Sequence, residues 1–139
     1  MLADGYFEWK KLGKKKQPFY IRMSDERPFA FAGLWESWLG PRGARLDKPL
    51  ETCTIITTDS NNLTSYVHDR MPAILRPEDC DFWLDCEFRA TDKLTEMLQP
   101  YDSNEMTMYP VSTLVNKPEN DRPECVVEAS GGPQQQMLF

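Results

Sequence analysis

The chain has 139 residues and a formal net charge of −6, and 40% of its residues are apolar. This length and composition allow one hydrophobic core and exclude two independent domains. The acidic balance argues against binding nucleic acid through total charge, so a surface that binds phosphate would have to be a local basic face.

The first part of the chain, residues 4–38, has the pattern of β-strands joined by short turns. It opens with an aromatic-rich run over 6–9, and the lysine-rich stretch 11–16 is typical of a hairpin tip. Aromatic and β-branched residues predict a second strand over 19–23, and an apolar run predicts a third over 27–38.

The predicted hairpin concentrates positive charge. Five lysines crowd into it, namely Lys10, Lys11, Lys14, Lys15 and Lys16, whereas much of the acid lies in residues 78–128. A partner that carries phosphate groups would bind to this local basic face. The alternative is a solvated lysine-rich turn, which is the commoner use of such a cluster taken alone.

The middle of the chain predicts a loop, a strand and three short helices. Residues 40–50 are a loop by composition, and the β-branched run within 52–58 is typical of a buried strand. The helices are expected over 61–67, from Pro77 to about Cys86, and over 93–98. The expected N-caps are Asp59 or Ser60 for the first helix and Thr91 or Asp92 for the third.

A last strand is predicted over 105–112, after which the chain becomes polar from Lys117. We therefore expect a folded region over residues 1–128 and a disordered tail over residues 129–139.

The four cysteines and the single histidine do not have zinc-ligand spacing, so no metal and no cofactor are expected. No apolar stretch approaches the roughly 18 residues of a membrane helix, and no signal peptide opens the chain. We expect free thiols in a reducing compartment, with Cys53 and Cys125 buried and inert in their apolar runs.

Glu8 is the first candidate for chemistry. On a strand it shares a face with Tyr6, and a carboxylate inside an aromatic run is costly to bury unless it is paired or transfers protons. The alternative, which sequence alone favours, is a glutamate on an edge strand that points at water.

The second candidate is the segment that carries His68 and Arg70. His68 is the only histidine, and in extended backbone Arg70 lies on the same side two residues later. An imidazole and a guanidinium on one face could hold a phosphodiester while acting on the neighbouring sugar. The alternative is a histidine satisfied by Asp69 or by a backbone carbonyl, with Arg70 in a structural ion pair.

Four segments form an ordered set of motifs, namely Ala3-Asp4-Gly5-Tyr6-Phe7-Glu8-Trp9-Lys10, Ala32-Gly33-Leu34-Trp35-Glu36, Thr54-Ile55-Ile56-Thr57-Thr58 and His68-Asp69-Arg70-Met71-Pro72. In their order and spacing they resemble one family, the SOS response-associated peptidase (SRAP) family. The resemblance implies an α+β fold of mainly antiparallel strands, in a partly open barrel-like sheet with a few short helices.

The resemblance also implies a covalent DNA-damage function. In this family an N-terminal cysteine attacks the aldehyde of an abasic site in single-stranded DNA, and its amine and thiol close a thiazolidine crosslink. By similarity, Glu8 would shuttle protons, His68 would help to open the deoxyribose ring, and Arg70 would contact phosphate. The implied protein is a monomer with peptidase- or lyase-like chemistry. The implied partners are abasic single-stranded DNA and replication-fork proteins, and the implied compartment is the nucleus, or the cytoplasm if the protein is bacterial.

The chain departs from the family pattern because it has no cysteine at its first position. Thiazolidine chemistry needs an amine and a thiol on one terminal residue, so the four internal cysteines cannot substitute. We therefore expect an SRAP domain that is incomplete at its N-terminus and forms no crosslink. The alternative is a non-catalytic pseudo-enzyme or interaction fragment that binds DNA or protein weakly.

Overall fold

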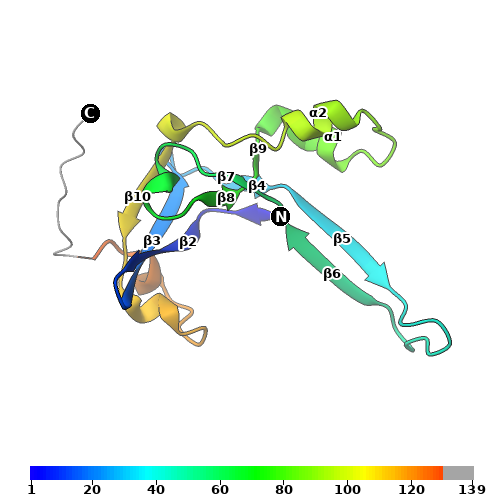
Figure 1. Cartoon of the computed structure of the whole chain (residues 1–139), viewed down its shortest axis with the longest axis horizontal. Coiled ribbons are helices and arrows are strands. Elements are labelled where there is room, and N and C mark those ends of the chain that lie inside the picture. Colours follow the sequence, from blue (N-terminus) through cyan, green and yellow to red (C-terminus); the bar gives the residue numbers. More distant parts are fainter. Residues whose placement is uncertain (130–139) are drawn as a thin grey trace.

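Residues 1–129, which the computed structural model describes, form small antiparallel sheets and a few short helices (Figure 1). The strands are β1 (Leu2–Ala3), β2 (Tyr6–Leu12), β3 (Lys15–Met23), β4 (Phe29–Phe31), β5 (Gly33–Trp38), β6 (Leu50–Ile55), β7 (Thr57–Asp59), β8 (Arg70–Pro72), β9 (Ile74–Leu75) and β10 (Met106–Pro110). The α-helices are α1 (Cys80–Leu84) and α2 (Thr91–Glu96). The 3₁₀ turns are η1 (Thr64–Tyr66), η2 (Pro77–Asp79), η3 (Ser103–Glu105), η4 (Thr113–Asn116) and η5 (Pro123–Val126).

The strands pair in four sheets, in the orders β1-β4-β9, β10-β3-β2, β5-β6 and β7-β8. Every pairing among these strands is antiparallel. The predicted α+β fold of mainly antiparallel strands is therefore confirmed, and the described strands do not close into a barrel.

The predicted N-terminal hairpin is confirmed as β2 and β3. Its turn contains Gly13 with a φ of 61°, a conformation that glycine adopts without steric cost. The register places Tyr6 opposite Ile21 and Glu8 opposite Phe19. Because residues directly opposite each other project to the same side of an antiparallel pair, the register also fixes which residues share each face of the hairpin.

The predicted third strand is wrong in one respect, because it breaks at Ala32 into β4 and β5. The fully buried Ala32 donates its backbone N–H to Ala73 and accepts from Ile56, while Ala73 donates to Ile56. Three backbone segments meet at this point, so the strand hydrogen bonds change partner there. The strand predicted over 52–58 breaks at Ile56, where the chain passes from β6 to β7, for the same reason.

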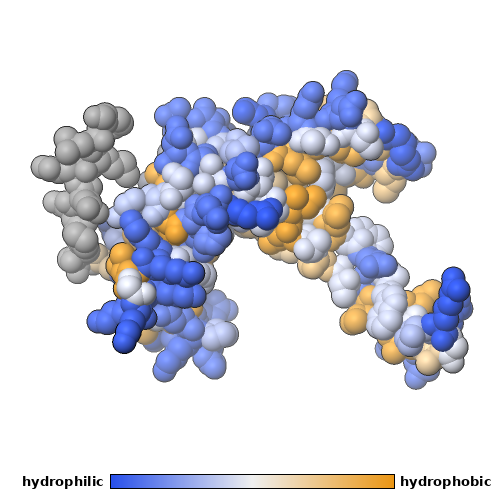
Figure 2. Space-filling view, viewed as in Figure 1, coloured by the Kyte–Doolittle hydropathy of each residue, from blue (hydrophilic) through white to orange (hydrophobic). Residues whose placement is uncertain are grey.

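The prediction that 52–58 is a buried strand is also wrong. β6 pairs only with β5, and the two project from the rest of the molecule as a hairpin (Figure 1). Cys53 on β6 is therefore exposed, contrary to expectation, whereas Cys125 is buried as expected. Apolar side chains gather at the base of this hairpin in Figure 2, and Trp35 on β5 is 74% exposed.

The helices are shorter than predicted, and two of the predicted caps are wrong. The segment 61–67 contains only η1, and Asn61 rather than Asp59 or Ser60 accepts hydrogen bonds from the amides at its start. Pro77 opens η2, which runs into α1 as expected. α2 begins at Thr91, so Thr91 and Asp92 lie inside the helix instead of capping it.

The strand predicted over 105–112 is confirmed as β10, one to two residues shorter at each end. Most of the tail predicted as disordered, residues 130–139, lies outside the described residues.

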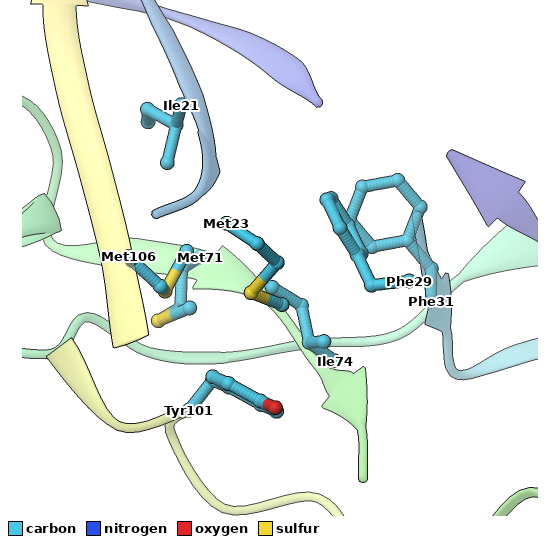
Figure 3. Close-up of a cluster of buried hydrophobic side chains, with 8 residues drawn as sticks. All are labelled: Ile21, Met23, Phe29, Phe31, Met71, Ile74, Tyr101 and Met106. Carbon is cyan, nitrogen blue, oxygen red and sulfur yellow. The ribbon is translucent and has the colours of Figure 1, made fainter. Parts of the chain in front are cut away.

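The main core lies between the sheet of β10, β3 and β2 and the shorter strands β4, β8 and β9 (Figure 3). Its buried members are Ile21, Met23, Phe29, Phe31, Met71, Ile74, Tyr101 and Met106. Tyr6 packs against this cluster, with its ring edge-on to Phe31 at a centroid distance of 5.7 Å. The face of β2 that carries Tyr6 is therefore the face that meets the core.

Candidate functional site

Glu8 lies in the middle of β2, on the same face as Tyr6 and Lys10. Its side chain is half-buried, and its Oε1 accepts a hydrogen bond from the backbone N–H of Trp9 at 3.0 Å. One oxygen is oriented by the backbone, and the other has no hydrogen-bond partner within residues 1–129.

The short turn η1 packs against this face of the hairpin. The ring of Tyr66 meets Phe19 edge-on at a centroid distance of 5.9 Å, and the Lys10 ammonium lies 3.0 Å from the centre of the same ring. Phe19 is directly opposite Glu8, and Lys10 is the next residue on that face of β2. The segment that leads into His68 is thereby held beside the strand that carries Glu8.

His68 follows η1 and remains accessible, with 47% of its side chain exposed. Its Nδ1 lies 3.1 Å from the backbone N–H of Arg70 and 3.0 Å from a carboxylate oxygen of Asp69. One ring nitrogen cannot serve both partners at once, since it accepts from the amide when unprotonated and donates to Asp69 when protonated. Nε2 has no hydrogen-bond partner among the described residues, so this nitrogen can meet a ligand.

Arg70 opens β8 and is exposed. Its guanidinium donates to the carbonyl of Thr57 on the paired strand β7 at 2.9 Å, which holds the side chain in place. A guanidinium carries five N–H donors, so most of them remain for an anion. The hydrogen bond from the Arg70 backbone N–H to the imidazole links His68 directly to the start of β8.

The hydroxyl of Tyr6 is a feature of the site that the sequence did not reveal. It is buried and has no hydrogen-bond partner within residues 1–129, two residues from Glu8 on the same face. Burial, and then the charge of Glu8, raise the pKa of Tyr6 well above its ordinary value. A neutral phenol therefore lies next to the candidate carboxylate. The only sequence signal for it was the alternation that puts both residues on one face.

Replacement of Tyr6 by phenylalanine is expected to stabilise the fold by about 1 kcal/mol, because it removes a buried hydroxyl that lacks a partner. Urea unfolding followed by tryptophan fluorescence measures the change. The matched control is Tyr109→Phe, which removes a hydroxyl that donates to the carbonyl of Val126 at 3.0 Å. The control should lower stability, and a loss of stability in Tyr6→Phe as well would contradict the unpaired hydroxyl.

Neither a metal centre nor a membrane span is found in the part of the chain that the structure describes. No group of three or more His, Cys, Asp or Glu side chains there could hold a metal ion. None of the helices there is both long enough and apolar enough to cross a bilayer.

These features define an α+β protein in which an exposed histidine and an exposed arginine follow a turn that packs against the hairpin of Glu8. The family model described as SOS response associated peptidase (SRAP) matches residues 1–118. The chain therefore belongs to the SRAP family, as the sequence motifs indicated.

Curated relatives come from bacteria, a bacteriophage, yeast and animals. The abasic site processing protein YoqW of Bacillus subtilis is 47% identical over 125 residues, which cover 89% of this chain and 54% of the relative. The abasic site processing protein HMCES of Gallus gallus is 36% identical, with 91% of this chain and 42% of the relative covered.

A crystal structure of a Bacteroides thetaiotaomicron protein has a TM-score of 0.80 and 36% identity, over 94% of this chain and 56% of that one. The chain thus spans about half the length of the relatives that it matches.

Proposed function

We propose that this chain acts in the processing of abasic sites in single-stranded DNA, with Glu8 and His68 as acid–base groups and Arg70 as a phosphate contact. Relatives that are 36–47% identical are named abasic site processing proteins. The observation that carries the residue roles is the packing of η1 on the face of β2. Through Tyr66, Phe19 and Lys10, it holds the His68 segment beside Glu8.

The family chemistry forms a thiazolidine from an abasic-site aldehyde and an N-terminal cysteine, with loss of one water. The α-amine adds to the aldehyde carbon, the resulting hydroxyl leaves as water, and the thiol adds to the C=N bond. Glu8 would take the proton that the amine releases and return it to the leaving hydroxyl. The accessible Nε2 of His68 would exchange the proton that opens the deoxyribose ring, while Arg70 would hold the adjacent phosphate.

The four cysteines of the 139 residues are all internal, so a purified protein of these residues alone is expected to bind an abasic site without forming a thiazolidine. Non-catalytic binding is therefore the second candidate function, in which the same side chains would grip DNA without reacting with it.

Binding to two matched oligonucleotides tests the proposal. The purified chain is titrated with single-stranded DNA that carries one abasic site and with the same strand intact, and binding is followed by fluorescence anisotropy. We expect tighter binding to the abasic strand and no complex that survives denaturing electrophoresis. Equal affinities would remove the proposed specificity. A complex that survives denaturation in the wild type but is lost in Glu8→Ala would contradict the absence of crosslinking.

A further inference from the structure

We propose that the β2–β3 hairpin forms a path for single-stranded DNA in which Lys10 and Lys15 contact phosphates beside the reactive site. This inference rests on the proposed function, since the path begins at Glu8. It gives a role to the lysine cluster, which the acid–base chemistry does not use. Only the lysines on one face of the hairpin are expected to contact phosphates, so substitutions on the two faces should differ in their effect.

The hairpin is strongly basic within an acidic chain. Residues 9–24 contain five lysines and Arg22 but no Asp or Glu, which gives this segment a charge of +6. The whole chain carries −6, so the remaining residues carry −12. None of the ion pairs found within residues 1–129 involves one of the five lysines. Within residues 1–129, no carboxylate neutralises the five ammonium groups, so they are able to bind an anionic partner.

The lysines around the tip of the hairpin are exposed, and two of them repel each other. Lys11 and Lys16 lie directly opposite each other on the two strands, and like charges in that position destabilise a hairpin. The residues around the turn, from Lys11 to Lys16, are all exposed, and they lie at the end of the molecule where the hairpin turns (Figure 1). The tip is therefore open to solvent on both faces, and the repulsion between Lys11 and Lys16 lies on the face opposite Glu8.

The register divides the lysines between the two faces of the hairpin. Lys10 lies on the face of Glu8, and so does Lys15, which is opposite Leu12. Lys11 and Lys16 lie on the other face. There the indole N–H of Trp9 donates to the side-chain oxygen of Asn116 at 2.7 Å, and a small hollow is lined by Trp9, Lys16 and Asn116.

Lys10 occupies the junction between Glu8 and the tip. A strand rises by about 3.4 Å per residue, so Lys10 lies about 7 Å from Glu8 along β2, and Lys15 lies about twice as far away. The ammonium of Lys10 rests over the ring of Tyr66, which Phe19 supports edge-on. This contact directs Lys10 toward the His68 segment, where a phosphate next to an abasic sugar would lie.

Two double variants with the same change in charge test the choice of face. Lys10→Gln/Lys15→Gln removes the lysines on the Glu8 face, and Lys11→Gln/Lys16→Gln removes those on the opposite face. The dissociation constant for the intact single strand is measured over a series of NaCl concentrations. We expect the first variant to bind at least about tenfold more weakly at low salt and to lower the log–log salt slope by about 1.4, or 0.7 for each lost phosphate contact.

The second variant should keep the slope within about 0.3 of wild type, because its lysines face away from the path. Equal losses in the two variants would overturn the inference, as would the absence of single-strand binding by the wild type at low salt. A different result would contradict the proposed function. The wild type would then bind abasic and intact strands equally, while the two double variants could still differ in their loss of binding.

Discussion

Replacement of Glu8 by glutamine is expected to slow covalent capture of an abasic site by at least about 100-fold. The test uses a fusion of this chain to the part of the B. subtilis relative that lies outside the matched region, made so that the protein begins with a cysteine. Glutamine keeps the shape and can still accept the hydrogen bond from the Trp9 amide, but it cannot take up a proton. General acid–base catalysis contributes about 10²–10⁴-fold, and the substitution removes that contribution. The rate is read from the crosslinked band on denaturing gels.

The matched control is Glu36→Gln, the same change of charge on the exposed strand β5. We expect it to crosslink at the rate of the unsubstituted fusion. A Glu8→Gln rate within about threefold of that rate would show that the carboxylate does not carry the proton transfers. A fusion that forms no crosslink at all would instead count against the thiazolidine chemistry itself.

The sequence predicted those features that depend on neighbours along the chain. The hairpin of β2 and β3 follows from its aromatic strands and the glycine at its turn. The position of Glu8 on the same face as Tyr6 follows from the two-residue period of a strand. The helix that Pro77 opens was predicted for the same kind of reason, because a proline at the first turn needs no distant partner.

The features that the sequence did not predict depend on contacts between distant segments. The strand break at Ala32 arises because this residue bonds to Ala73 and Ile56, and nothing near it in the chain indicates those partners. The exposure of Cys53 follows from the projection of β6 on a two-stranded hairpin, although its β-branched neighbours are equally typical of a buried strand.

The relation between Glu8 and His68 is also of this long-range kind. Each residue could be named from its local pattern and from the family resemblance. The packing of the segment before His68 on the hairpin of Glu8 depends on Tyr66, which contacts Phe19 and Lys10. The unpaired hydroxyl of Tyr6 could not be predicted from the sequence either, since it results from burial against the core cluster.

Replacement of Ile21 by alanine is expected to lower the free energy of unfolding by about 3 kcal/mol. Ile21 is 0% exposed on β3, the central strand of its sheet, where it lies opposite both Tyr6 on β2 and Met108 on β10. Loss of its three methyl and methylene carbons leaves a cavity in the main core cluster, and such truncations cost about 2–5 kcal/mol. This is a large share of the roughly 5–15 kcal/mol that stabilises a typical domain. Urea unfolding, followed by circular dichroism, measures the change.

The control is Leu34→Ala, which removes an aliphatic side chain of the same size that is 57% exposed on β5. A change below about 0.5 kcal/mol is expected there.

The two variants Ile21→Ala and Glu8→Gln also distinguish a loss of folding from a loss of reactivity. Ile21 lies on β3, the strand that pairs with the strand of Glu8. In the fusion, Ile21→Ala should therefore reduce crosslinking only in proportion to the fraction of protein that is unfolded. Glu8→Gln should slow the reaction by at least about 100-fold in a protein that remains folded. If Ile21→Ala slowed crosslinking while leaving unfolding unchanged, the Ile21 side chain would contribute to the reaction as well as to stability.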